Sequence, residues 1–385
     1  MLDRMAVGAL PPKHHTRHEA PDGTLYWEQC LTRRGFDGPY SILYHEHPPH
    51  HQLPNSVAVG WPAPEAAEGL PLRKRHFRTA DLPEAGGAPV NSRRPVAFNE
   101  DVVISVLKPG TEDPVYVNNG DGDELLFILK GGGILRSAFG DLQFETHDYV
   151  LIPKGVVYRL IPSEAEQFWL SFECPGGLSL PAQWRNDAGQ LRMDAPFSHR
   201  DFRRPEFRGP IEEGIRSLVV KRGGQFAGFS VPHSPLDAVG WDGTVYPLVF
   251  PIHRFQPRVG QVHLPPDAHG TFVTPGALIC SFVPRAVDFH DQAIPCPYPH
   301  SSVDCDELLF YCGGDFTSRT GVGPGSVSIH PAGIPHGPHP GAYQASIGAR
   351  QTEELAVMID TFKPLSVTRQ ALAVEDGSYM DSFVA

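Results

Sequence analysis

The chain has 385 residues, a length that suits two domains better than one small one. Apolar residues make up 41% of it, which is enough for packed cores and excludes a disordered protein. The formal net charge of −12 argues against a broad nucleic-acid-binding surface. The 40 prolines and 39 glycines interrupt helices and favour many short strands joined by turns.

The amino terminus lacks the features of a secretory signal, because residues 1–18 contain no apolar core of the required length. No apolar run approaches the length of a membrane span, and none of the six cysteines forms a C-x-x-C pair. These features predict a cytoplasmic protein with reduced thiols and with neither membrane nor nucleic-acid partners.

Residues 1–60 are rich in proline and histidine and include the run His45-Glu-His47-Pro-Pro-His50-His51. A histidine-rich tract can bind metal. Here the histidines are scattered among prolines and aromatic residues, so we interpret the tract as loops or subunit contacts in preference to a metal site. Residues 61–95, rich in alanine, proline and arginine, are expected to form a surface connection.

Strand signals strengthen after residue 97, and the apolar run 102–107 predicts a buried strand. The sequence D-E-L-L-F then occurs twice, at 123–127 and at 306–310, each time with a glycine seven residues after the glutamate. The Pro-x-Gly spacing at 153–155 likewise recurs at 331–333. This internal repeat predicts an all-β fold with few short helices, built from two related barrels in tandem.

The remaining segments fit around this repeat. Residues 175–215 are turn-rich, the segment 211–219 is expected to include one short helix, and strands resume near residue 217. In the tail, 355–359 predicts a strand and 367–372 a helical turn. We therefore divide the chain into an N-terminal region with a first barrel, 1–212, and a second barrel with its tail, 213–385.

The two copies differ at the positions where metal chemistry would occur. Seven residues before Glu124 lies Val117, where the second copy has His300, and Tyr158 takes the place of His336. One carboxylate without imidazoles cannot hold Fe(II) against water. The first barrel is therefore predicted to be metal-free, with Glu124 as a hydrogen-bonded remnant.

The second copy carries H-x(6)-E-x(6)-G, beginning at His300, and then G-x(5)-P-x-G-x(2)-H, ending at His336. These patterns resemble the two signature motifs of the cupin family, whose fold is a double-stranded β-helix barrel. Two imidazoles and a carboxylate with open positions form the facial triad of non-haem Fe(II) oxygenases. Many cupins have H-x-H, but Ser302 fills the second slot here. Three ligands, His300, Glu307 and His336, favour an open catalytic centre over a closed structural one.

Most of the chain also resembles the homogentisate 1,2-dioxygenases, as a divergent member. The resemblance is carried by Leu43-Tyr-His-Glu-His-Pro-Pro, the Gly-Trp…Tyr-Pro block at 240–247, and the ending Ile334-Pro-His336-Gly-Pro. It implies that the metal ligands bind Fe(II). The family's acid/base histidine precedes the first ligand by some forty residues in a His-x-x-Pro context, which His263 matches best, with His269 as the alternative. The resemblance implies these substrate-binding positions: Tyr298, Phe316, His330 and His336.

The activity so implied is cleavage of a dihydroxylated aromatic acid by O₂, with homogentisate converted to maleylacetoacetate in tyrosine and phenylalanine catabolism. Phe316 replaces a pocket tyrosine of the family, so gentisate, hydroquinone or another dihydroxy aromatic remains an alternative substrate. Further alternatives are a metal-dependent isomerase and a non-catalytic two-barrel cupin. The resemblance also implies a homotrimer or homohexamer. A substrate carboxylate could be bound by any of three arginines: Arg258, Arg285 or Arg319.

Overall fold

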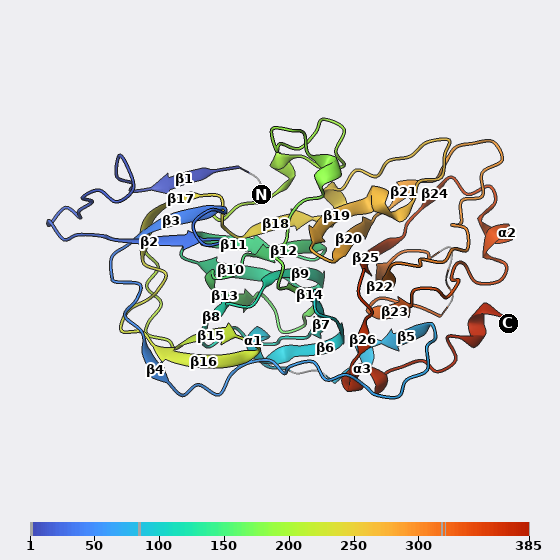
Figure 1. Ribbon diagram of the computed structural model, residues 1–385, viewed down its shortest axis with the longest axis horizontal. Helices are drawn as coiled ribbons and strands as arrows, with labels where there is room; N and C mark the ends of the chain where they lie inside the picture. Colours follow the sequence, from blue (N-terminus) through green and yellow to red (C-terminus); the bar gives the residue numbers. More distant parts are fainter. Residues whose placement is uncertain (1–2, 84–85, 317–318, 320, 385) are drawn as a thin grey trace.

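The computed structural model describes residues 3–83, 86–316, 319 and 321–384. Within them the chain consists mainly of short antiparallel strands, with few helical turns (Figure 1). This confirms the all-β fold of two cupin barrels in tandem. No helix in these residues has both the length and the apolar character needed to span a membrane.

Two seven-stranded sheets form the first barrel. One has the strands β11 (Gly140–Phe144), β10 (Gly133–Ser137), β13 (Val157–Pro162), β8 (Tyr116–Asn119), β15 (Leu218–Arg222), β16 (Gln225–Ser230) and β4 (Leu53–Asn55). The other has β18 (Leu248–Pro251), β12 (Asp148–Ile152), β9 (Asp123–Lys130), β14 (Phe168–Cys174), β7 (Val103–Leu107), β6 (Arg93–Phe98) and β26 (Ser366–Val367). The apolar side chains between them form most of the buried core.

The second barrel is built on a six-stranded sheet. Its strands are β19 (Gly270–Thr274), β20 (Ala277–Phe282), β25 (Leu355–Thr361), β22 (Asp306–Gly313), β23 (Ser326–His330) and β5 (Arg75–Arg78). A two-stranded sheet, β21 (Arg285–Ala286) and β24 (Gln351–Thr352), lies beside it (Figure 1). A four-stranded sheet at the other end of the molecule contains β1 (Met5–Gly8), β17 (Ala238–Gly243), β3 (Tyr40–His45) and β2 (Trp27–Thr32).

Helices are short throughout the described chain. The α-helices are α1 (Pro89–Ser92), α2 (Ala342–Ser346) and α3 (Arg369–Leu372). The 3-10 turns are η1 (Thr79–Asp81), η2 (Ala182–Trp184), η3 (His199–Asp201), η4 (Ile252–Arg254), η5 (Pro266–His269) and η6 (Asp381–Phe383). The predicted tail strand and the helical turn that follows it are confirmed as β25 and α3.

The internal repeat extends to the pairing of individual residues. In the second barrel, His300 pairs with His336 across an antiparallel bridge, and Glu307 lies opposite His330. In the first barrel, the equivalent pairs are Val117 with Tyr158 and Glu124 with Ile152. The strands of both barrels therefore present these positions in the same register, and only the side chains differ.

The aspartates of the two D-E-L-L-F segments are also equivalent. Asp123 accepts hydrogen bonds from the backbone N–H groups of Lys154 and Leu178, at 2.8 and 2.7 Å. Asp306 accepts the matching pair from Ala332 and Leu365, at 2.8 and 2.7 Å. In each barrel this carboxylate joins the first motif to the turn of the second, so the aspartate has a structural role.

A guanidinium fills the space beside the carboxylate of the first barrel. Arg93 on β6 pairs with Glu124, and its second nitrogen donates to the Ser171 hydroxyl at 2.9 Å. The Tyr158 hydroxyl donates to the other oxygen of Glu124 at 2.8 Å. The ring of Trp61 lies 4.0 Å from the Arg93 guanidinium. Glu124 is confirmed as a hydrogen-bonded remnant whose charge is balanced by an arginine.

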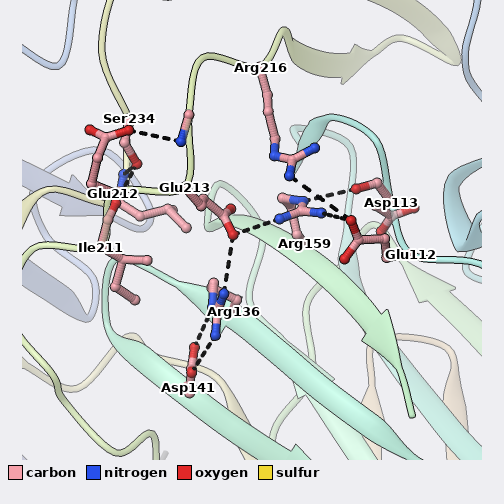
Figure 2. A network of polar contacts seen from close by, with 12 residues as sticks. Glu112, Asp113, Arg136, Asp141, Arg159, Ile211, Glu212, Glu213, Arg216 and Ser234 are labelled. Atoms are coloured by element: carbon pink, nitrogen blue, oxygen red, sulfur yellow. Dashed lines mark hydrogen bonds and ion pairs between the residues drawn. The ribbon is translucent and has the colours of Figure 1, made fainter.

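The predicted helix at 211–219 is wrong. Residues 211–217 are irregular, and β15 begins at Leu218. Ion pairs hold this segment against the first barrel, since Glu213 accepts from Arg159 at 2.6 Å and from Arg136 at 3.2 Å (Figure 2). Gly214, at a φ of 83°, turns the chain away from helical geometry directly afterwards.

Strands cross between the two halves of the chain. Strands β15 to β18, from 218–251, pair with strands of the first 212 residues. In the opposite sense, β5 forms an edge strand of the second barrel, and β26 from the tail pairs with β6 (Figure 1). The expected surface connection at 61–95 thus contributes a buried strand. The division at residue 212 stays a proposal, and strands from both sides of it share sheets.

Candidate metal centre and cavity

Three side chains of the second barrel converge at one place. Glu307 lies at the start of β22, His336 follows β23, and His300 precedes β22. Backbone hydrogen bonds of 2.8 and 2.9 Å in both directions join His300 to His336, and their ring centroids are 4.3 Å apart. One donor atom from each of the three residues lies within 4.8 Å of the others. The structure therefore brings together the three ligands predicted from the motifs.

Both histidines are oriented by the same local contact. Nδ1 of His300 donates to the Tyr298 carbonyl at 3.2 Å, and Nδ1 of His336 donates to the Ile334 carbonyl at 3.3 Å. Each bond fixes the tautomer that leaves Nε2 with a free lone pair. Nε2 of His336 is buried without a hydrogen-bond partner and lies 3.6 Å from Oε1 of Glu307. Such an orphaned nitrogen beside a carboxylate fits a divalent metal ion.

Glu307 is held from its other side by a chain of two further residues. Nδ1 of His330 donates to Oε1 of Glu307 at 2.6 Å, and the Tyr379 hydroxyl donates to Nε2 of His330 at 3.0 Å. Burial lowers the pKa of His330 to about 4, so this ring is neutral at pH 7. Burial alone would raise the pKa of Glu307, but the hydrogen bond from His330 and the nearby imidazole of His336 outweigh it and hold that pKa well below the usual range. The carboxyl is therefore ionised, as a metal ligand must be.

A second buried carboxyl lies next to this group. Asp360 on β25 is the cross-strand neighbour of Glu307. Burial and then the charge of Glu307 raise the pKa of Asp360 to about 7. Sequence reasoning missed both Asp360 and Tyr379, because neither belongs to a motif. The repeat offered one signal, since Glu173 of the first barrel holds the position equivalent to Asp360, opposite Glu124.

The triad opens onto a cavity of about 380 Å³. His300 and Glu307 form part of its wall, together with His263, His269 and Tyr298. His263 packs edge-on against Tyr298, with ring centroids 5.2 Å apart. The cavity therefore brings both candidate acid/base histidines, and one predicted substrate-binding residue, to the same place as two members of the triad.

The two acid/base candidates have different environments. His269 is 7% exposed and packs against the ring of Phe282, with its Nδ1 buried and unpartnered. Burial, followed by the charge of Arg285, lowers the pKa of His269 to about 3. His263 is half-buried at the cavity wall. A histidine that stays neutral far below pH 7 is a poor proton acceptor, so the surroundings of His269 argue against it in that role.

All three candidate arginines line the cavity. Arg258 is bonded to Asp194, and its guanidinium lies 4.7 Å from the Trp184 ring. Arg285 is paired with Glu354 at 3.0 Å. Arg319 donates to the carbonyl of Gly337, the residue after the ligand His336. The cavity thus combines an apolar wall with cationic groups, a combination that is common in small-molecule binding pockets.

Other predicted substrate-binding residues lie behind the cavity wall. His330 is fully buried between Glu307 and Tyr379, so its side chain supports a ligand and does not face the cavity. The Phe316 ring packs edge-on against Tyr311, with centroids 4.8 Å apart, and is not part of the lining. His336 also reaches the site from behind the lining, through the Nε2 that faces Glu307.

The amino-acid sequence is similar to proteins of one known family. The family described as "Homogentisate 1,2-dioxygenase N-terminal" matches residues 101–252. "Putative dioxygenase SSO1533" of Saccharolobus solfataricus is 33% identical over 97% of this chain and 96% of its own length. The chain belongs to the homogentisate 1,2-dioxygenase family. It is a divergent member, since the "Homogentisate 1,2-dioxygenase" of Nitrobacter hamburgensis is 28% identical, over 94% of this chain and 86% of that protein.

A further relative agrees with this membership. The "Homogentisate 1,2-dioxygenase" of Bradyrhizobium diazoefficiens is 29% identical over 66% of this chain and 58% of its own length. Among solved structures, a "Cupin 2 conserved barrel domain protein" from Leptotrichia buccalis covers 78% of this chain and 98% of its own, with 11% identity and a TM-score of 0.34. The two barrels of this member of the homogentisate 1,2-dioxygenase family are defined by the strand pairings described above.

Proposed function

We propose that this protein is an Fe(II)-dependent dioxygenase that cleaves the ring of a dihydroxylated aromatic acid. The observation that carries the proposal is the group of His300, Glu307 and His336, which meets a cavity lined by further histidines and by arginines. Two imidazoles and one carboxylate are the ligand set of non-haem Fe(II) oxygenases. Membership of the homogentisate 1,2-dioxygenase family supports the same reaction class.

The chain itself supplies orientation and charge for this chemistry. When bound, Fe(II) would hold O₂ and a ring hydroxyl side by side and pass electron density between them. His300 and His336 present Nε2 lone pairs because their Nδ1 protons are bonded to carbonyls. Glu307 is kept ionised and in one rotamer by His330, and Tyr379 in turn fixes the ring of His330.

Proton transfer is assigned to His263. It lies on the cavity wall against Tyr298, where its ring can approach a hydroxyl of a bound aromatic. In this role one of its ring nitrogens takes the phenol proton and later returns it, which suits an imidazole near neutral pH. His269 is the alternative, although its low pKa argues against it.

Homogentisate, converted to maleylacetoacetate, is the substrate that family membership favours. Its carboxylate needs a cationic partner, and Arg258, Arg285 and Arg319 are all at the cavity wall. Each arginine is replaced in turn by Gln, and the variant that lacks the carboxylate-binding arginine should have a raised KM for an aromatic acid. The same replacement should leave KM for hydroquinone, which has no carboxylate, unchanged.

A related substrate is the second candidate, and Phe316 is the observation that favours it. The resemblance to the family implies a pocket tyrosine at this position, whereas the ring of Phe316 packs on Tyr311 and does not line the cavity. A pocket without that hydroxyl suits gentisate, hydroquinone or another substituted ring. The relative kcat/KM across such a panel distinguishes these substrates from homogentisate.

One experiment tests the reaction class directly. Protein purified anaerobically is analysed for iron, and O₂ uptake is then measured with homogentisate, gentisate and hydroquinone. We expect about one iron per chain and stoichiometric O₂ consumption with a ring-cleaved product. Activity without O₂ would instead indicate an isomerase, and failure to bind iron would indicate a non-catalytic two-barrel cupin. Light scattering on the same sample tests the proposed homotrimer or homohexamer.

A further inference from the structure

A second group of potential ligands lies far from the triad. His47 follows β3, and His233 and Asp237 lie in the loop before β17, so two distant segments contribute. One donor atom of each lies within 4.8 Å of the others. Strands β3 and β17 are neighbours in the four-stranded sheet at the end of the molecule opposite β22 and β23 (Figure 1). This group contains part of the histidine-rich tract that the enzymatic site does not use.

The carboxylate of Asp237 is the fixed point of the cluster. Its side chain is 6% exposed, and Oδ1 accepts from Nδ1 of His45 at 2.7 Å. Oδ2 accepts from the backbone N–H of His47 at 2.7 Å and lies 2.9 Å from Nδ1 of the same residue. These three contacts hold the buried carboxylate in one position.

The two imidazoles are arranged side by side above this carboxylate. The rings of His47 and His233 are stacked, with centroids 4.5 Å apart and planes inclined by 15°. Nδ1 of His233 donates to the Ser234 carbonyl at 3.2 Å, which leaves Nε2 as the atom with a free lone pair. That Nε2 is buried and has no hydrogen-bond partner. A buried unpartnered nitrogen next to an anionic carboxylate requires an explanation.

The distances agree with donors that share one ion. Two ligand atoms, each about 2.1 Å from an ion and separated by an angle between 90° and tetrahedral, lie roughly 3.0 to 3.4 Å apart. The 2.9 Å contact between Nδ1 of His47 and Oδ2 of Asp237 is a hydrogen bond whose proton a bound ion would displace, with a small increase in the separation of the two atoms. The His47 side chain is 50% exposed, so an ion can reach the cluster and keep a water molecule as its remaining ligand.

We propose that His47, His233 and Asp237 form a second metal site, which takes a borderline divalent cation such as Zn²⁺. Two imidazoles, one carboxylate and one water are a common four-coordinate set for this ion. The bound ion would join the segment after β3 to the loop before β17, which are two neighbouring strands of the four-stranded sheet. None of its three ligands belongs to the cavity lining beside His300 and Glu307.

Metal titration of the full-length protein tests this proposal. The apo protein is titrated with Co²⁺, a spectroscopic substitute for Zn²⁺, in a His300→Ala/His336→Ala background that removes the triad. We expect one equivalent of Co²⁺ to bind and to show the visible d–d absorption that indicates a low coordination number. Zn²⁺ should then displace the bound Co²⁺. Adding His233→Ala should weaken binding at least tenfold, while His51→Ala, an exposed histidine of the same tract, should leave it unchanged.

Two results would overturn the proposal. The first is a triad-free protein that binds no Co²⁺ although its circular dichroism is that of the folded wild type. The second is binding that His233→Ala leaves intact. The wild-type protein provides a further check that does not depend on the triad variant, because it should bind two equivalents of Co²⁺ and the single variant His233→Ala only one. In the His300→Ala/His336→Ala background, thermal stability should rise with Zn²⁺, and this rise should be lost when His233→Ala is added.

Discussion

The hydroxyl of Tyr379 lies 3.0 Å from Nε2 of His330, a residue 49 positions earlier in the chain. Through this contact the C-terminal tail orients the imidazole that supports Glu307. Metal-ligating carboxylates and histidines generally depend on such supporting groups for their geometry. The tail is therefore part of the candidate metal centre, although it contributes no ligand.

Replacing Tyr379 by Phe should weaken this support without removing a ligand. The buried Nε2 of His330 loses its donor, which typically costs about 1–3 kcal/mol of folding free energy. We expect lower kcat for O₂ uptake, faster loss of iron to a chelator, and an unchanged KM. The matched control is Tyr343→Phe on α2, a partly exposed tyrosine that should tolerate the change. Normal iron retention in Tyr379→Phe would contradict the supporting role.

Removal of either triad histidine should abolish both iron binding and turnover. His300→Ala and His336→Ala each leave two ligands, which cannot hold Fe(II) in competition with water. Iron content of protein purified from iron-supplemented cells, together with the O₂ electrode, measures both effects. His290→Ala, an exposed histidine ahead of the motif, serves as the control and should behave as wild type. Full O₂ uptake by either triad variant would refute the ligand assignment.

His263→Ala should keep its iron but lose rate. A positioned general acid/base typically contributes about 10²- to 10⁴-fold, and kcat should fall within that range. Because the cavity wall retains its other members, KM should change less than kcat. If this variant turns over normally while His269→Ala does not, the proton-transfer role belongs to His269.

The buried His269 should make folding stability depend on pH. Its folded pKa of about 3 lies below the ordinary value of 6.5, so the unfolded chain binds more protons between these limits. Stability is therefore fully present above pH 6.5 and decreases as pH falls towards 3. In His269→Gln the slope of unfolding free energy against pH, between pH 4 and 6, should be smaller by up to about 1.4 kcal/mol per pH unit. Urea denaturation at several pH values measures it, and equal slopes would contradict the assignment.

Removing only one partner of the buried ion pair in the first barrel should lower the free energy of unfolding. Arg93→Met leaves Glu124 as a buried unpaired charge, which typically costs about 3–5 kcal/mol. Adding Glu124→Gln removes that charge but keeps an acceptor for Tyr158, so the double variant should be more stable than Arg93→Met alone. Denaturant unfolding measures both variants, and iron content should be the same in each. Additive losses would show that the two residues are not coupled.

Those residues of the candidate site whose positions depend on local spacing along the strands could be predicted from the sequence. The ligands lie in two motifs with fixed separations, and the register of β22 and β23 brings them together. Tyr379 and Asp360 could not be found in this way, because their contacts depend on the path of distant segments. Arg93 was missed for the same reason, since it lies 31 residues before Glu124 and outside the repeated motif.

The two barrels were likewise predictable from the D-E-L-L-F repeat, but their mutual exchange of strands was not. Pairing between β5 and β23, or between β26 and β6, leaves no mark in the sequence of either partner. Strand patterns report which face of a strand is buried and do not report its neighbour. The helix expected at 211–219 failed because ion pairs to Arg136 and Arg159 fix an irregular path there.

Arg93 also gives the two halves of the chain different sensitivities to their surroundings. A guanidinium is covalently attached and permanently charged, so no chelator can extract it and no oxidant can change its valence. The carboxylate it neutralises therefore stays neutralised under conditions that would remove or oxidise the Fe(II) that we propose for Glu307. The N-terminal barrel therefore has a balanced buried charge as soon as it folds. It gives constant structural support to the second barrel, whether or not the proposed metal ion is bound there.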